Sequence, residues 1–191
     1  MELALPPEWV ADLPTDRPLT ADDVLRLPEG PPFFELIAGE IVVSPPAIPA
    51  HSRAIRNLFL ALHEACPSHL EVFPNEVDWV VDQSNVFEPD VIVVPRANVG
   101  EKRLSGPPVL AVEILSPRTR KRDLTVKREK FAEGGCPAYW IVDLKKGPEL
   151  TVLELDPAAG RYVEVARIAG DGVHHATIPY PVDIDVARLQ D

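Results

Sequence analysis

Two acidic residues interrupt apolar runs in the middle of the chain. Asp90 lies in the run at residues 87–94, and Glu113 lies in the run at residues 108–115. Both runs are rich in β-branched and aliphatic side chains and are bounded by proline or glycine, which is typical of strands buried on both faces. An ionised carboxylate in such a strand is costly to desolvate unless a cation or several hydrogen-bond donors meet it. We therefore expect each acid to have a partner.

The spacing of the two acids allows them to share a metal ion. Asp90 opens its predicted strand and Glu113 follows 23 positions later, so the two strands can be neighbours in one sheet. Two carboxylates brought together repel each other, and a hard divalent cation with oxygen ligands relieves that repulsion. The pair therefore predicts a metal site. A structural alternative stands for each acid: Glu113 could pair with a buried arginine, and Asp90 could cap the turn after Pro89.

A helix is predicted at residues 122–134, directly after the second acid. Its spacing places Leu124 and Phe131 on one stripe, with Lys127 and Arg128 on the two flanks of that stripe. Either cation could therefore point toward the sheet. A lysine that only snorkels to solvent is the structural alternative.

Charge is distributed unevenly along the chain. The formal net charge of −11 argues against a general nucleic-acid coat, because affinity for phosphate backbones comes mainly from cationic side chains. Residues 118–130 nevertheless carry seven lysines and arginines against two acids. A phosphate-bearing substrate could be drawn to this segment, with Arg118, Arg120 and Arg122 as the candidate contacts, although a solvated basic helix face is the alternative.

The composition is that of an ordinary globular protein. The 191 residues are 46% hydrophobic and 26% charged, which predicts a single domain at residues 19–191 after a proline-rich arm at residues 1–18. No apolar run approaches the ~20 residues that span a bilayer, and the N-terminal segment is acidic rather than basic. We therefore expect no membrane partner and a cytoplasmic location. The two cysteines are too few for a disulfide framework or a zinc cluster.

Two upstream elements carry further candidates. A tight hairpin is predicted from residues 33–37 and 40–44, and Glu35 shares a face with its apolar residues, where it could supplement the metal shell or be an edge-strand charge. A helix is predicted from about residue 50 to 65, with His51 in its first turn. That histidine could meet a phosphate or carboxylate, or serve as a capping or packing residue. Further strands are expected at residues 71–74, 76–81, 138–143, 150–155, 162–168 and 174–178.

Several short motifs of the sequence resemble those of a known nuclease group. Pro89-Asp90 and Glu113 look like the Pro-Asp and Glu-x-Lys halves of the PD-(D/E)XK nuclease superfamily. The neighbouring words resemble the Uma-type restriction-endonuclease family: Phe34-Glu35-Leu36-Ile37, Gly39-Glu40, Glu113-Ile114-Leu115-Ser116-Pro117, Lys127 to Phe131, and Pro137-Ala138-Tyr139-Trp140. The chain departs from Glu-x-Lys at Leu115, where the lysine would stand. The resemblance favours Lys127 as the relocated lysine, marks Glu35 as the better hairpin acid, and extends to a histidine near position 51.

The resemblance implies both a fold and an activity. The implied fold is α/β, a restriction-endonuclease-like central mixed sheet flanked by helices with additional β-hairpins. The implied activity is metal-dependent endonucleolytic hydrolysis of phosphodiester bonds, with DNA as the expected substrate and a two-fold homodimer as the expected assembly. Asp90 and Glu113 would hold Mg²⁺ (or Mn²⁺), and Lys127 would orient or activate a water. A catalytically inactive nucleic-acid-binding module, consistent with Leu115, and an assembly protein are the alternatives.

Overall fold

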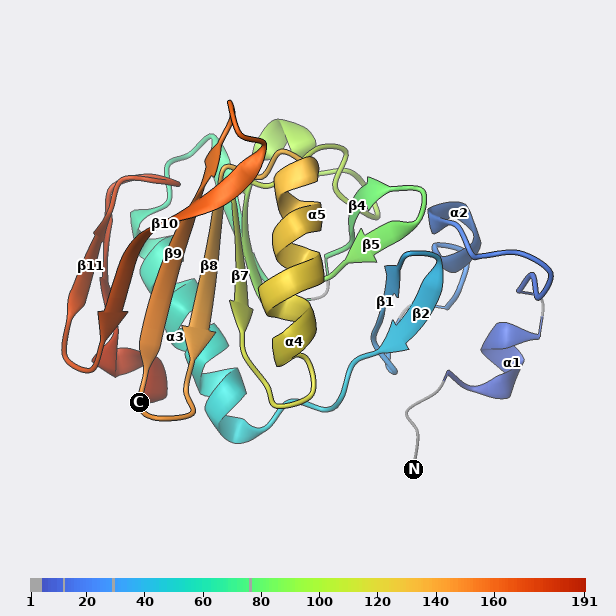
Figure 1. Ribbon diagram of the computed structural model, residues 1–191, viewed down its shortest axis with the longest axis horizontal. Helices are drawn as coiled ribbons and strands as arrows, with labels where there is room; N and C mark the ends of the chain where they lie inside the picture. Colours follow the sequence, from blue (N-terminus) through green and yellow to red (C-terminus); the bar gives the residue numbers. More distant parts are fainter. Residues whose placement is uncertain (1–4, 12, 29, 76) are drawn as a thin grey trace.

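A mixed sheet of six strands forms the centre of the molecule (Figure 1). The computed structural model describes residues 5–11, 13–28, 30–75 and 77–191. The strand order is β10-β9-β8-β7-β6-β3, and only β7 and β8 run parallel. The strands are β3 (Leu70–Pro74), β6 (Val91–Pro95), β7 (Leu110–Ile114), β8 (Ala138–Asp143), β9 (Glu149–Asp156) and β10 (Arg161–Ala169). The predicted α/β fold with a central mixed sheet is confirmed.

The strands next to the two acids are neighbours, as their spacing predicts. Strands β6 and β7 pair antiparallel, with Val91 opposite Val112. Extending this register by one residue brings Asp90, just before β6, opposite Glu113 in β7. All five residues of β7 are buried, because helices cover both faces of this part of the sheet.

Helices cover opposite faces of the sheet. Helix α3 (Pro49–Ala65) packs Ala54, Leu58 and Leu62 onto one face. The other face is covered by a continuous helical crossover that joins β7 to β8; it consists of α4 (Arg120–Arg122), η2 (Asp123–Lys127) and α5 (Arg128–Glu133). Figure 1 shows α3 behind the sheet and the crossover in front of it. A crossover of this kind is needed because parallel strands cannot be joined by a tight turn.

One turn of the crossover, η2, is a π-helix rather than an α-helix. A π-helix closes its hydrogen bonds over five residues, so its side chains advance by a smaller angle per residue than those of an α-helix. Asp123, Lys127 and Phe131 therefore form the buried stripe, while Leu124 is 38% exposed. The prediction that Leu124 packs on the sheet was wrong, because regular α-helical spacing does not hold here.

The predicted hairpin of Glu35 belongs to a second sheet. Strands β1 (Phe34–Ile37) and β2 (Glu40–Val43) form it, and its turn has positive φ at Ala38 and Gly39, as a two-residue type I′ turn requires. The sheet order is β2-β1-β5-β4, with β4 (Trp79–Asp82) and β5 (Asn85–Phe87). The hairpin therefore does not extend the central sheet.

Proline explains the division between the two sheets. The predicted strand at residues 87–94 is split into β5 and β6, and Pro89 lies between them. Proline has no N–H to donate to a strand ladder, so the chain leaves one sheet and enters the other there. This split leaves Asp90 at the junction of the two sheets.

The remaining elements complete the chain. They are α1 (Pro7–Val10), α2 (Ala21–Val24), η1 (Arg96–Asn98), β11 (Val173–Ala176), β12 (Val182–Asp185) and η3 (Ala187–Gln190). Strands β11 and β12 form a separate hairpin, and β12 and η3 lie against α3. In the strand predicted at residues 76–81, residue 76 lies outside the described residues, and the observed strand begins at Trp79. Among the described residues, no helix has the length and apolar character to cross a bilayer.

Candidate active site

A buried lysine joins the two sheets at their junction. The Nζ atom of Lys127 lies 2.6 Å from Oε1 of Glu113 and 2.7 Å from Oε1 of Glu35. Oδ1 of Asp123, one turn earlier, is 3.8 Å from the same nitrogen. All four side chains are buried. The sequence expectation that Lys127 points toward the sheet is confirmed, and Glu35 is a buried partner of this lysine rather than an edge-strand charge.

The charges of this cluster stabilise one another. Burial disfavours the ammonium of Lys127, but Glu113, Glu35 and Asp123 outweigh it and raise the pKa of Lys127. Burial also raises the pKa of Glu113 well above its usual value; Lys127 opposes this shift, whereas the neighbouring acids add to it. Lys127 is therefore a permanent cation, and the ionised form of Glu113 needs further positive charge nearby.

Asp90 meets Glu113's strand through the backbone. Its Oδ2 accepts a hydrogen bond of 2.6 Å from the amide of Ile114. The Nε2 atom of His51 lies 3.2 Å from the same oxygen and 3.1 Å from the carbonyl oxygen of Ile114. Burial lowers the pKa of His51, but the hydrogen bond and charge of Asp90 outweigh burial, so the net shift is upward. The position of His51 in the first turn of α3 thus brings its ring into contact with the Asp90 carboxylate.

A cavity of about 500 Å³ opens onto these residues. Its lining includes Asp90, Glu113 and Lys127 together with residues of the segment between β2 and α3. The Asp90 side chain is 16% exposed, more than any acid that contacts Lys127. The two predicted acids therefore lie on the same side of the molecule and face an opening to solvent.

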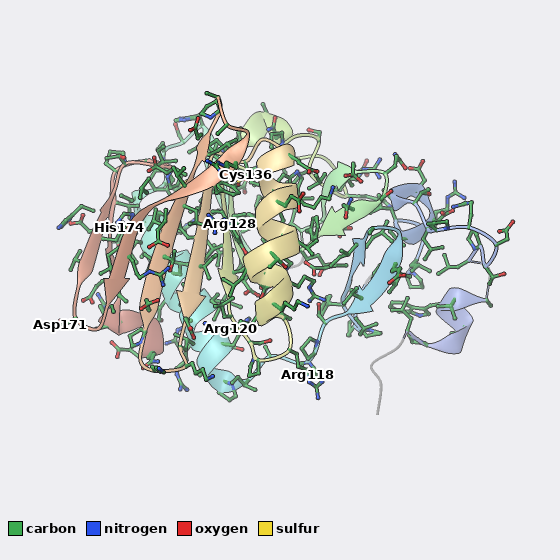
Figure 2. All side chains as sticks on the ribbon, viewed as in Figure 1. Arg118, Arg120, Arg128, Cys136, Asp171 and His174 are labelled. Atoms are coloured by element: carbon green, nitrogen blue, oxygen red, sulfur yellow. The ribbon has the colours of Figure 1, made fainter. Side chains whose placement is uncertain are left out.

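The three predicted arginines point in different directions. Nη2 of Arg122 lies 3.6 Å from Oε2 of Glu35, and both Arg122 and Arg118 line the cavity. Figure 2 shows Arg118 below the helical crossover with its side chain directed outward. Arg120 instead donates a hydrogen bond of 2.6 Å to Asp143 at the end of β8. The structure thus brings Arg118 and Arg122 to the cavity but directs Arg120 elsewhere.

The donor set fits a hard divalent cation. With all four ionised, the acids Glu35, Asp90, Glu113 and Asp123 would carry four negative charges; Lys127 and Arg122 contact this cluster, and Arg118 lines the same cavity. Oε2 of Glu35 is buried without a hydrogen-bond partner, which is costly for a carboxylate oxygen.

Within the described ranges, no three histidine, cysteine or acidic side chains form a ready ligand group. An ion at Asp90 and Glu113 would therefore keep waters in its shell, as Mg²⁺ usually does. The oxygen donors nevertheless fit such an ion, whose charge would favour the ionised forms of Glu113 and Asp123.

Asp123 is a member of the cluster that sequence reasoning missed. Burial raises the pKa of its carboxyl, although Lys127 opposes this shift. Its signal in the sequence is the spacing of four that separates Asp123, Lys127 and Phe131. Residues four apart are neighbours on a helix, so this spacing could have indicated Asp123. A regular α-helix, however, places Leu124 closer than Asp123 to the direction of Phe131, and the π turn reverses that order.

The six-stranded mixed sheet, the paired acids on adjacent strands and the nearby lysine define a restriction-endonuclease-like class of protein. A family model, Uma2, described as "Putative restriction endonuclease", matches residues 21–186. The chain belongs to this family. Membership supports a nuclease function.

Comparison with solved structures supports the same fold. A crystal structure from Anabaena variabilis, titled as a "putative nuclease belonging to DUF820", superposes with a TM-score of 0.70 at 19% identity. The match covers 90% of this chain and 97% of the other. Among curated proteins, none matches this chain.

Proposed function

We propose that this protein is an endonuclease that hydrolyses phosphodiester bonds in DNA, using Mg²⁺ or Mn²⁺ held by Asp90 and Glu113. The observation that carries the proposal is the ammonium of Lys127, 2.6 Å from Glu113, in the lining of a cavity that Asp90 also lines. This arrangement supplies an amine beside the glutamate even though Leu115 occupies the usual lysine position. It therefore weakens the alternative of an inactive module.

Each residue of the cluster has a distinct part in the proposed reaction. Lys127 remains protonated, so it orients the attacking water and offsets charge on the phosphate rather than abstracting a proton. Glu35 holds Lys127 in place and belongs to the outer acidic shell. Arg118 and Arg122 contact the phosphate backbone from the cavity wall. When bound, the metal ion lowers the pKa of a water and offsets charge developing on the phosphate oxygens.

His51 supports Asp90 in this proposal. Its Nε2 contacts both Asp90 and the carbonyl oxygen of Ile114, so it links α3 to the strand that carries Glu113. A contact from this histidine to the substrate phosphate is the second part of its expected role. The accompanying assembly is a homodimer, because cleaving two strands calls for two sites, and the accompanying location is the cytoplasm.

The central experiment is a plasmid cleavage assay with Mg²⁺ or Mn²⁺ and an EDTA control. We expect metal-dependent cleavage by the native chain and its loss in Asp90→Asn and Glu113→Gln. Asp183→Asn is the matched control, because this exposed acid contacts His175 on the β11–β12 hairpin, away from the cavity. Equal cleavage by Glu113→Gln and the native chain would refute the proposed site.

Calorimetry with the same variants separates the competing functions. We expect binding of Mn²⁺ to the native chain and to Asp183→Asn, and no binding to the two site variants. DNA binding without metal binding or cleavage would favour the inactive module. Light scattering after size-exclusion chromatography tests the homodimer.

A further inference from the structure

The reactive groups are buried residues in the lining of the cavity rather than exposed residues of the protein surface. The side chains of Glu113 and Lys127 are only 6% and 4% exposed, and Asp90 is 16% exposed. A cavity of about 500 Å³ lies within the range, about 300–1,000 Å³, that encloses a single small ligand. An intact duplex is too wide to enter it. Enzymes that act on a base in such a pocket take one nucleotide out of the stack or use single strands. A phosphodiester that must reach buried groups gains similar access when its nucleotide is unpaired.

One wall of the cavity is apolar and stiff. The segment from β2 to α3 contributes Pro45, Pro46, Ala47 and Ile48, and Ile48 is 64% exposed. Figure 1 shows this segment passing below the loop that leads into α4. Prolines fix the backbone in advance, so a contact there costs little conformational entropy. The side chains of Pro45 to Ile48 offer no donor to a phosphate, but they suit the flat face of a base.

Other residues of the cavity lining are cationic. Arg118 and Arg122 come from the loop and helix after β7, and the buried Lys127 lines the same cavity. A strand that enters the cavity therefore meets both positive charge and aliphatic surface. Aliphatic side chains such as isoleucine and proline are the kind that separate base steps in nucleic-acid complexes.

The charge of the whole protein leaves binding to local contacts. A net charge of −11 gives little long-range attraction for any phosphate backbone, single-stranded or duplex. An unpaired base, unlike a paired one, can add a local contact with side-chain surfaces.

We propose that the substrate is DNA with an unpaired nucleotide, whose base lies against Pro45–Ile48 while its phosphate reaches Asp90 and Glu113. This inference rests on the proposed nuclease function and narrows its substrate class. A homodimer would require the duplex to be opened at each site before cleavage.

The test compares one labelled oligodeoxynucleotide as a single strand, as a perfect duplex, and as a duplex with a central bulge. Cleavage is measured with Mn²⁺, and binding is measured in EDTA by fluorescence anisotropy on the full chain. We expect the single strand and the bulged duplex to be cleaved about tenfold or more faster than the perfect duplex, in line with the cost of unpairing a base. Equal or faster cleavage of the perfect duplex overturns the inference while leaving the proposed function intact.

Variants of Ile48 provide the second arm. Ile48→Ala is expected to weaken single-strand binding by about fivefold or more, and Ile48→Trp to strengthen it, because an aromatic face stacks better on a base. Leu60→Ala is the matched control. Leu60, like Ile48, is an exposed aliphatic residue, but it lies on α3 and lines a different cavity. Unchanged binding in both Ile48 variants overturns the inference. Absence of cleavage of every probe overturns the proposed function, and the inference with it.

Discussion

The Nζ atom of Lys127 and Oε1 of Glu113 are 2.6 Å apart, although the two residues are 14 positions apart in the chain. In the Glu-x-Lys word of the superfamily, the amine comes from the same strand as the glutamate. Here that strand position is Leu115, which packs against the apolar cluster around Phe131. Here the amine is that of Lys127, which the helical crossover places against Glu113 from one face of the sheet.

Removal of this amine should destabilise the fold. Lys127→Met leaves Glu113, Glu35 and Asp123 facing one another without their shared cation. Breaking a buried ion pair in this way costs about 3–5 kcal/mol. We expect a loss of this size in the free energy of unfolding by urea.

Lys130→Met is the control for that measurement. Lys130 pairs with Glu133 on the exposed side of the same helix, and such a surface pair is worth about 0–1 kcal/mol. Equal destabilisation by the two substitutions would show that the Lys127 cluster does not support the fold.

The amine should function from the strand as well as from the helix. Leu115→Lys places a lysine on the same face of the strand as Glu113. We therefore expect the double variant Leu115→Lys with Lys127→Met to recover part of the metal-dependent cleavage that Lys127→Met loses. The measurement is the cleavage rate of the preferred oligonucleotide. A double variant as inactive as the single one would mean that the helix position itself is required.

Phe131 should be a main anchor of the helical crossover. Its fully buried ring lies 4.9 Å from that of Trp79, 5.2 Å from that of Phe87 and 5.1 Å from that of Tyr139. Phe131→Ala should cost about 3–5 kcal/mol through lost contacts and the cavity left behind. Urea unfolding measures it, and an effect below that of the exposed Leu124→Ala would contradict this packing.

The two cysteines should differ in reactivity. Burial raises the pKa of the Cys136 thiol to about 12, whereas Cys66 is partly exposed. At pH 8 such a pKa leaves about one thiol in ten thousand ionised, and the thiolate is the reactive form. We expect Ellman's reagent to label one cysteine in the native protein and two in urea, with Cys66→Ser removing the native signal.

The raised pKa of Cys136 also predicts that stability decreases at alkaline pH. The folded-state pKa of Cys136 lies above that of an unfolded cysteine, about 8.5, so the unfolded state loses its proton first. The contribution of this thiol to stability is therefore fully present below pH 8.5 and falls as the pH rises toward 12. Urea unfolding of Cys136→Ala should lack this alkaline component.

The positions of several site residues could be predicted because they lie in short, recognisable sequence motifs. Buried strands with one acid each are conspicuous, so Asp90 and Glu113 could be found without knowing the fold. Glu35 and Lys127 followed from their apolar surroundings and from the family resemblance. All four lie together in the structure.

The remaining parts depend on geometry that the sequence does not display. The π turn, which exposes Leu124 and buries Asp123, depends on packing against the sheet rather than on residue preference. The separation of the hairpin from the central sheet depends on where strand pairing stops, near Pro89. The choice of Asp143 as the partner of Arg120 depends on a contact between distant segments.

The π turn at Asp123–Lys127 also makes this helix unusually sensitive to chain length. It accommodates one residue more than a regular turn would, and the side chains before and after it are in phase only because of that extra residue. Deleting one residue within it would rotate the two halves of the helix by about 100° relative to each other. Phe131 anchors the second half of the helix, so Asp123 and Arg122 would move away from Lys127. Deletion of one residue that is not itself in the cluster would therefore be enough to disrupt the cluster around Lys127.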